Sequence, residues 1–141
     1  MDLRDIRKFF KSYEKAVCDS DAEAMVSHYS EPFMAFSLGR VVTMPNRKQA
    51  ALDSQPYLDL LKRTGLAKTI IVDLSTTTVS DHFTLCYPVF QMAPEDGSPP
   101  WQFRNVYGMR HDDKGARLEF AISDNEMENL LQRYPALFKT L

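Results

Sequence analysis

The chain has 141 residues, of which 44% are hydrophobic and 26% charged, with a formal net charge of −2. A chain of this length buries roughly 68–70% of its unfolded surface without disulfides or metals, so we expect one domain over residues 1–141. The mild acidity argues against nucleic-acid binding, and the absence of an apolar stretch of about 18 residues argues against a membrane span.

The N-terminal third predicts two helices followed by a strand. Apolar residues recur at a spacing of 3.6 residues, which is typical of an amphipathic helix; they are Ile6, Phe9, Phe10, Tyr13, Ala16 and Val17. The segment from Ser20 to Glu23 reads as a capping box that starts a second helix. The inward residues of that second helix are predicted to be Ala22, Met25, Val26 and Tyr29. An aromatic strand from Phe33 to Leu38 is expected next.

A third helical region is predicted between Asn46 and Gly65. Asn46 is a favourable N-cap with Gln49 in the capping-box position, and Gly65 suits the position after a helix end. Pro56 lacks a backbone N–H and clashes with the preceding turn, so we expect the helix to break or restart near Ser54.

The second half of the chain is predicted to be an antiparallel meander that ends in a short helix. Four runs have strand-like composition or alternation; they are Thr69–Ser80, His82–Met92, Trp101–Arg110 and Arg117–Ser123. Residues 93–100 read as a loop and residues 112–115 as a hairpin turn. The segment from Ser123 to Glu126 is expected to cap a helix with Met127, Leu130 and Leu131 inward. Helices separated from a strand meander indicate the α+β class.

The order of these elements resembles the nuclear transport factor 2-like superfamily, which includes ketosteroid isomerase and the SnoaL-like polyketide cyclases. The stretch from Tyr13 to Tyr29 is similar to the usual opening of that family. The resemblance implies a cone-shaped (cystatin-like) fold, in which a curved antiparallel sheet wraps around the N-terminal helices. It does not imply one activity, because the superfamily includes enzymes, binding proteins and transport adaptors.

A comparison with the ketosteroid isomerases tests one possible activity. The resemblance places Tyr13 on their oxyanion-hole tyrosine, Ser37 on their general-base aspartate, and Tyr107 near their second oxyanion-hole group. Serine cannot remove a carbon-bound proton near neutral pH without a base of its own. We therefore do not expect ketosteroid isomerase activity.

Strict alternation on the run from Trp101 to Arg110 puts one aromatic face inward. In the resembling family, the inward sheet face lines a pocket roofed by the first three helices. The residues that would share this pocket are Tyr13, Phe33, Ala35, Ser37, Trp101, Phe103, Asn105 and Tyr107. Two phenols facing one ligand suit a carbonyl or enolate oxygen. The alternative is that these aromatic residues simply fill the core.

The proton carrier that such a site would need is not obvious from the sequence. Asp73 lies in an apolar run, and a carboxylate inside an apolar pocket would have a raised pKa; the alternative is that Asp73 faces water. His82 lies in a predicted turn, His28 near a helix end, and Asp124 after the last strand. We take Tyr13, Tyr107, Asp73 and His82 as the candidate catalytic residues.

The remaining features favour no cofactor. Cys18 and Cys86 lack metal-ligand spacing and the glycines are scattered singly, so we expect no metal site, no phosphate loop and no cofactor. The N-terminus lacks the apolar run of a signal peptide, which favours a cytoplasmic protein.

Two functions compete on these grounds. The first is binding of a small hydrophobic, oxygen-bearing ligand in the cone, with isomerisation, dehydration or cyclisation as the possible chemistry. The second is a non-enzymatic homodimer that uses the exposed sheet face, with an apolar C-terminal segment ending in Leu137 and Phe138.

Overall fold

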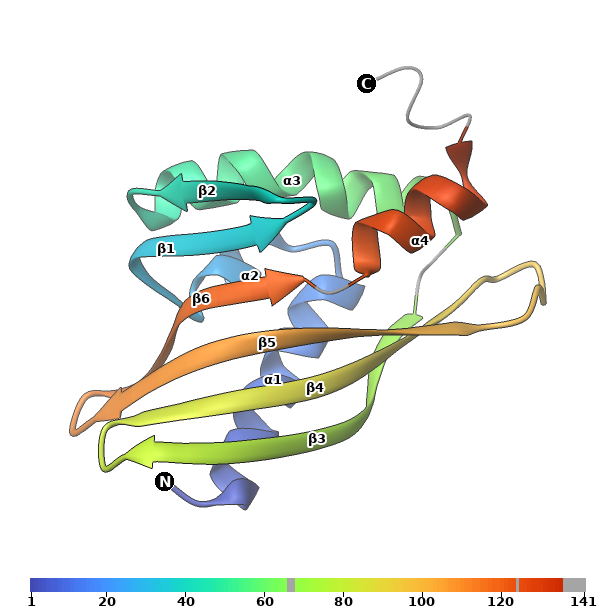
Figure 1. Ribbon diagram of the computed structural model, residues 1–141. Helices are drawn as coiled ribbons and strands as arrows, with labels where there is room; N and C mark the ends of the chain where they lie inside the picture. The colour runs from blue at the N-terminus through green and yellow to red at the C-terminus, as the bar shows by residue number, and fades with distance from the viewer. Residues whose placement is uncertain (66–67, 124, 136–141) are drawn as a thin grey trace.

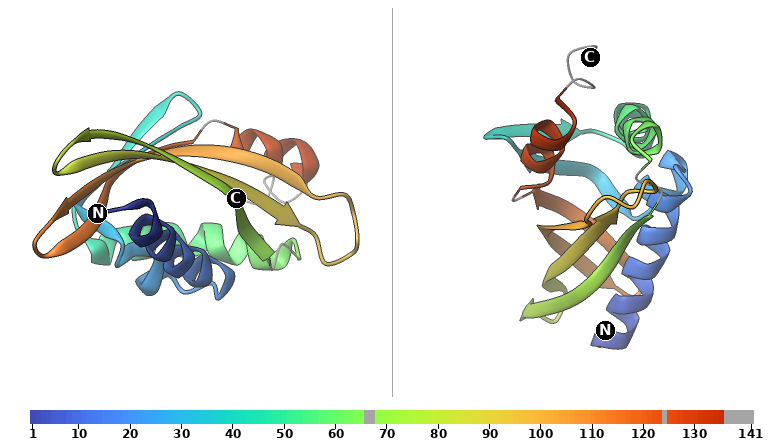
Figure 2. Two further views of the ribbon diagram at one scale, coloured as in Figure 1. Left: turned by 90° about the horizontal axis from the view of Figure 1, so that it is seen from below. Right: turned by 90° about the vertical axis from the view of Figure 1, so that its right-hand side faces the viewer.

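The body of the molecule is a curved six-stranded sheet with three helices on its concave side (Figures 1 and 2). The computed structural model describes residues 1–65, 68–123 and 125–135. The helices are α1 (Leu3–Cys18), α2 (Ala22–Val26), α3 (Arg47–Arg63) and α4 (Glu126–Arg133). The strands are β1 (Tyr29–Ser37), β2 (Arg40–Met44), β3 (Lys68–Ser80), β4 (Phe83–Ala93), β5 (Trp101–Asp112) and β6 (Gly115–Ser123). The arrangement agrees with the predicted α+β class.

The sheet has the strand order β2-β1-β6-β5-β4-β3. Strands β3 to β6 form the predicted antiparallel meander. The sheet is mixed, however, because β1 pairs with β6 in parallel. This pair differs from the antiparallel prediction because β1 enters beside the last strand of the meander and runs in the same direction. The result is a hairpin joined to a meander.

Strand β2 was not predicted, although the local signal for it is present. Leu38 and Gly39 both have positive φ angles, 53° and 71°, which is typical of a two-residue hairpin turn. The β-branched residues Val41, Val42 and Thr43 follow directly. Strand β1 also begins earlier than predicted, so Tyr29 belongs to a strand and not to the second helix.

The junction of α1 and α2 corrects the predicted capping box. Ser20 has a positive φ of 54° and terminates α1, with its N–H bonded to the carbonyl of Val17. A residue used to end one helix in the left-handed conformation cannot also take the extended N-cap conformation. The N-cap of α2 is therefore Asp21, whose carboxylate accepts from the N–H of Ala24.

Helix α3 corrects the predicted break at Pro56. The helix runs unbroken from Arg47 to Arg63, with Asn46 as its N-cap as predicted. Proline removes the hydrogen bond that the carbonyl of Leu52 would accept. Leu52 is 62% exposed, so water can solvate that carbonyl. Gly65 follows the C-cap with a φ of 70°, in the predicted role.

Alternation along the strands divides the sheet into two faces. The inner face packs on α1, α2 and α3, and it contributes Phe90, Met92, Phe103 and Met109 to the core. The outer face points away from these helices toward the viewer of Figure 1. Its apolar members are Met34, Phe36, Phe83, Leu85, Tyr87, Val89, Val106, Phe120 and Ile122. We use "inner face" and "outer face" in this sense below.

Helix α4 follows the end of β6 and lies between β5 and α3 in Figure 1. Leu130 of α4 is fully buried, whereas the N-cap residue Asn125 makes no side-chain capping bond. Asp124, Leu137 and Phe138, which the sequence analysis singled out, lie outside the described residues. Among the described helices, none is long and apolar enough to cross a membrane.

Candidate functional site

Three tyrosines from different elements meet inside the cone. Tyr13 comes from α1, Tyr29 from the start of β1 and Tyr107 from β5; each is at most 6% exposed. The hydroxyls of Tyr13 and Tyr29 lie 2.8 Å apart in a hydrogen bond. The ring centroids of Tyr13 and Tyr107 lie 5.9 Å apart, edge to face. We call these three residues the tyrosine cluster.

A buried amide links the tyrosine cluster to a carboxyl group. The Nδ2 of Asn105 donates to the hydroxyl of Tyr107 at 3.2 Å and to Oε1 of Glu126 at 3.4 Å. The other carboxylate oxygen of Glu126 accepts from the hydroxyl of Tyr57. Helix α3, strand β5 and the first turn of α4 thus converge on one polar network within an apolar interior.

Burial sets the protonation states in this network. Removal from water raises the pKa of Tyr107 to about 12, and it raises the pKa of Tyr13 well above its usual range. Burial also raises the pKa of Glu126, although the bonds from Tyr57 and Asn105 oppose the shift. The phenols are therefore neutral hydrogen-bond donors at ordinary pH. Glu126 is a carboxyl with increased proton affinity, as suits a general acid or base.

The predicted pocket residues lie on the inner face as expected from alternation. Phe33 stacks on Tyr29 with ring centroids 3.8 Å apart, and Phe103 stacks on Phe90 at 5.0 Å. Ala35 and Ser37 follow Phe33 along β1 on the same side. Trp101 is 6% exposed and lies under Arg133, whose guanidinium is 4.5 Å from the ring centroid.

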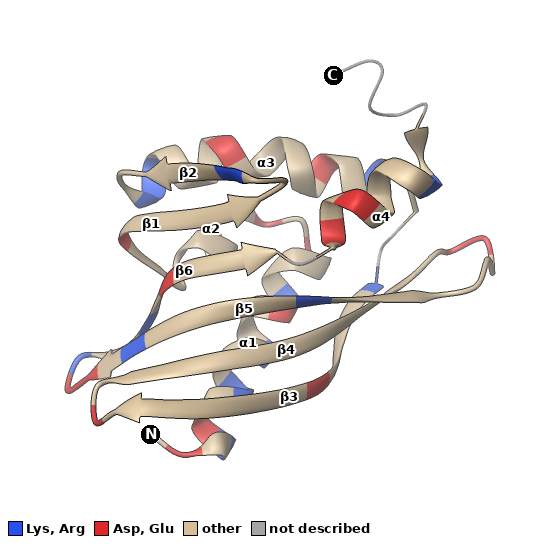
Figure 3. Cartoon of the chain, in the orientation of Figure 1, with Lys and Arg blue, Asp and Glu red and all other residues tan. Residues whose placement is uncertain are grey.

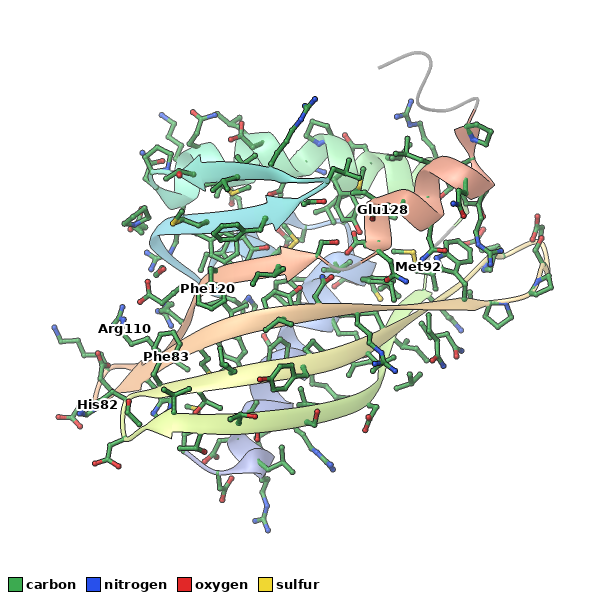
Figure 4. The ribbon with its side chains drawn as sticks, in the orientation of Figure 1. His82, Phe83, Met92, Arg110, Phe120 and Glu128 are labelled. Atoms are coloured by element: carbon green, nitrogen blue, oxygen red, sulfur yellow. The ribbon has the colours of Figure 1, made fainter. Side chains whose placement is uncertain are left out.

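Asp73 and His82 do not join this group. A bulge in β3 between Ile71 and Asp73 shifts the alternation, so the Asp73 side chain is exposed on the outer face. His82 is exposed in the turn between β3 and β4, at the opposite end of the sheet from Glu128 of α4 (Figure 4). The structure therefore separates both predicted proton carriers from the tyrosine cluster.

Three members of the network were missed as site residues. Tyr29 was assigned to the core of a helix, and Glu126 was read only as part of a capping segment. Tyr57 follows Pro56, where a break was expected, so its position on a continuous α3 was not considered. Ser54 and Leu58 are both buried on α3, and Tyr57 lies three residues after Ser54. This helical spacing is the signal that could place Tyr57 beside the buried side of α3.

His28 has a structural role, as its position near a helix end suggested. Its Nδ1 lies 3.0 Å from the carbonyl oxygens of Ala24 and Met25, and its Nε2 lies 3.0 Å from the hydroxyl of Ser12. Burial lowers the pKa of this imidazole. His28 therefore ties the end of α2 to α1.

Two clefts on the described surface do not reach the tyrosine cluster. One of about 640 Å³ is bordered by Tyr87, Arg104 and Ile122 of the outer face, and Asn105 and Ser123 also line it. Another of about 530 Å³ lies between α2 and α3, beside Val26 and Leu52. Neither is lined by the tyrosine cluster or Glu126. Within the described ranges, no group of three His, Cys, Asp or Glu residues could hold a metal ion.

Comparisons with known proteins agree on the fold. A family model described as "NTF2-like protein (DUF6841)" matches residues 4–137. No curated protein matches the chain.

Solved structures similar to the chain have a cystatin-like fold with several descriptions. A domain of unknown function with a cystatin-like fold from Nostoc punctiforme is 16% identical, with a TM-score of 0.68, covering 100% of this chain and 89% of that one. A candidate scytalone dehydratase from Novosphingobium aromaticivorans is 12% identical, with a TM-score of 0.59 and coverages of 85% and 80%. At such low identities these likenesses show the fold alone, and they confirm the predicted cystatin-like architecture.

Proposed function

Because the chain belongs to this NTF2-like family, whose fold serves proteins of different kinds, we propose a function from its own interior. The proposal is that the cone binds a small hydrophobic ligand with an oxygen function, and that neutral phenols donate to that oxygen. The single observation that supports it is a cluster of polar groups inside an apolar core. Asn105 is hydrogen-bonded to Tyr107 and Glu126, and the ring of Tyr107 lies edge to face against Tyr13, whose hydroxyl bonds to that of Tyr29.

A core that served only stability would not need this network. Burying phenols, an amide and a carboxyl group costs free energy that the hydrogen bonds between them only partly offset. Apolar side chains of similar volume would fill the same space without that cost. Polar groups that converge from three elements within an apolar interior are typical of small-molecule sites.

Glu126 is the proton carrier in this proposal, in place of Asp73 and His82. Its carboxylate accepts a proton from the carbon next to the ligand carbonyl. The electrons of that C–H bond move toward the carbonyl oxygen, and a neutral phenol donates to the resulting enolate. The proton then returns from Glu126 to the same carbon or to another one. This chemistry does not need a base at Ser37, because Glu126 arrives from α4.

Binding is tested by thermal shift with cyclic ketones, phenols and lactones. A ligand that binds the folded state raises its melting temperature with concentration. We expect Tyr107→Phe to weaken the best ligand by about tenfold, which corresponds to about 1.4 kcal/mol. Tyr87→Phe is the matched control, since it removes a phenol from the outer face. A panel without any stabilising compound, or equal effects of the two variants, would contradict the proposal.

Proton transfer is tested separately by exchange of deuterium into a bound ketone in D2O, followed by NMR. The wild type should speed exchange at the carbon next to the carbonyl, and Glu126→Gln should abolish the acceleration while retaining ketone binding. If the ketone binds but its exchange is not accelerated, the proposal of ligand binding stands and the proposal of catalysis is contradicted.

The outer face supports a second candidate function, self-association as a homodimer. Phe83 and Phe120 stack there with centroids 6.3 Å apart, and Ile122 is 42% exposed. Asp73 pairs with Val89, which pairs with Arg104, so opposite charges lie on the two sides of Val89. Two copies related by a two-fold axis could place Arg104 of one against Asp73 of the other.

Sedimentation at tens of micromolar tests this second candidate. We expect a dimer that Ile122→Lys dissociates, whereas Leu52→Lys on α3 changes an exposed leucine away from the sheet and leaves association intact. A wild-type monomer at that concentration would contradict the candidate.

A further inference from the structure

A row of polar side chains crosses the inner face at the end of the sheet next to α4. Asn105 on β5 is the register partner of Ser123 on β6. Ser37 and Ser123 are the next residues beyond the paired Phe36 and Ile122 on β1 and β6. The three side chains therefore lie side by side on adjacent strands, and we call them the serine–asparagine row.

Each residue of this row has a buried polar atom without a hydrogen-bond partner among the described residues. These atoms are the Oγ of Ser37, the Oδ1 of Asn105 and the Oγ of Ser123. Asn105 is only 7% exposed. A buried polar atom that makes no hydrogen bond loses its hydration without compensation. Three such atoms in one row indicate a place where something else supplies the partners.

The preceding row on the same strands is different. Ala35 pairs with Ala121, and Ala121 pairs with Tyr107. Ala35 and Ala121 carry no polar side-chain group, and the hydroxyl of Tyr107 already accepts from Asn105. Of these two rows, the unpartnered atoms therefore lie in the one nearest Glu126 and α4. Thr69 Oγ1 and Trp101 Nε1 are also buried without a partner, but they lie outside both rows.

The hydrogen-bonding state of Asn105 determines what the row can accept. Its Nδ2 is occupied by Tyr107 and Glu126, so the amide orientation is fixed and Oδ1 remains as an acceptor. A ligand must therefore bring a donor to Oδ1. The serine hydroxyls can rotate to donate or accept. The nearby carboxyl of Glu126 disfavours an anionic ligand, because like charges repel in a buried site.

We propose that the serine–asparagine row is a subsite for hydroxyl groups, and that the ligand is a neutral ring compound with at least two hydroxyls. One hydroxyl donates to Oδ1 of Asn105, and a second bonds with Ser37 and Ser123 on the neighbouring strands. The ring itself packs on the aromatic interior. This inference rests on the proposed function, since it names the class of ligand for the same cone.

The test compares 1-naphthol with 1,3-dihydroxynaphthalene by calorimetric titration. We expect the dihydroxy compound to bind wild type at least about tenfold more tightly, as two extra hydrogen bonds in a buried site imply. In the double variant Ser37→Ala/Ser123→Ala this ratio should fall to near one, while the affinity for 1-naphthol stays within about twofold. Ser75→Ala, on exposed β3, is the matched control and should keep the wild-type ratio.

A second readout needs no ligand. Because the serine hydroxyls lack partners, their removal should not lower the melting temperature of the free protein, whereas loss of a partnered hydroxyl would. A clear fall in melting temperature for the double variant would overturn the assignment of unpartnered hydroxyls.

The outcomes separate the two proposals. Binding of both naphthols with equal affinity overturns the hydroxyl subsite and leaves the ligand-binding cone intact. Binding of neither naphthol, together with no response to the ketone, phenol and lactone panel, overturns the proposed function and the subsite with it.

Discussion

The two faces of the sheet are built from the same strands but meet different surroundings. The inner face is covered by α1, α2 and α3 and includes a buried polar network around Asn105. The outer face is open and apolar, with Phe83 and Phe120 stacked across β5 (Figure 4). Most charged residues of the strands gather in turns and near strand ends (Figure 3).

This difference teaches that each face departs in one place from a simple globular sheet. An ordinary half-buried sheet places apolar residues inside and polar residues outside. Here a few polar groups lie within the apolar inner face, where they cost stability, and several apolar groups lie on the outer face, where they cost solubility. Each departure is the basis of one of the two proposals above: a ligand for the inner face and a second copy of the chain for the outer face.

The largest effect that separates the faces is expected from truncating the core. Phe10 on α1 is 1% exposed and contacts Tyr107, with ring centroids 5.4 Å apart. Phe10→Ala should lower the free energy of unfolding by about 3–5 kcal/mol, through lost burial and a cavity. Val79 on the outer side of β3 is 60% exposed, and Val79→Ala should change it by less than about 0.5 kcal/mol. Urea denaturation measures both, and similar losses would contradict the division into two faces.

A smaller loss is expected when the outer face is overfilled. A Cβ on Gly108 would lie 2.2 Å from Cε1 of Phe120, so the phenyl ring must leave its place over β5. Gly108→Ala should therefore cost about 1–3 kcal/mol of stability. The same substitution in a Phe120→Ala background removes the clash and should cost much less. If Gly108→Ala lowers the stability equally in both backgrounds, the loss comes from the backbone at this position and not from the clash with the Phe120 ring.

Much of the fold could be predicted because its determinants are local. Alternation from Trp101 to Arg110 identified the inner face of β5 correctly, and Asn46 begins α3 as its side chain predicts. The errors arose where two local signals compete. Ser20 could cap α2 or end α1, and the left-handed backbone that ends α1 prevailed. Pro56 disfavours a helix, but the packing of Leu58 and Leu61 maintains it.

The site could be predicted only where it depends on strand alternation. Tyr107 and Asn105 were identified from the pattern of a single strand. Glu126 and Tyr57 lie 69 residues apart and meet only in the tertiary structure, through a hydrogen bond between their side chains, which no local pattern encodes. For Asp73 the sequence leaves two orientations open, inward or toward water, and the bulge at that point puts it on the exposed outer face.

The buried hydroxyl pair provides a finer test of the inner face. In Tyr13→Phe, the hydroxyl of Tyr29 keeps its burial but loses its partner. We expect a loss of about 1–2 kcal/mol, because an unpaired buried hydroxyl costs its full desolvation. The double variant Tyr13→Phe/Tyr29→Phe removes both hydroxyls and should recover part of that loss. A double-mutant cycle by thermal denaturation gives the coupling, and simple additivity would contradict it.

The smallest expected effect is the change in protein stability with pH that Glu126 causes. Burial raises the pKa of this carboxyl above its ordinary value of 4.5. The folded state therefore holds the proton more tightly than the unfolded state. The contribution of Glu126 to stability is fully present below pH 4.5 and is lost as pH rises through the raised pKa. Glu126→Gln should flatten this decline and make the protein more stable than wild type at neutral pH.

A matched control separates this effect from helix electrostatics. Glu23 lies in the first turn of α2, as Glu126 lies in the first turn of α4, but Glu23 is exposed. A carboxylate near a helix N-terminus is stabilised by the helix dipole, so Glu23→Gln should not raise stability at neutral pH. If unfolding curves from pH 4 to 8 change alike in both variants, the helix terminus explains the result. If only Glu126→Gln gains stability with rising pH, the buried network on the inner face carries the cost, as a site that retains a proton carrier requires.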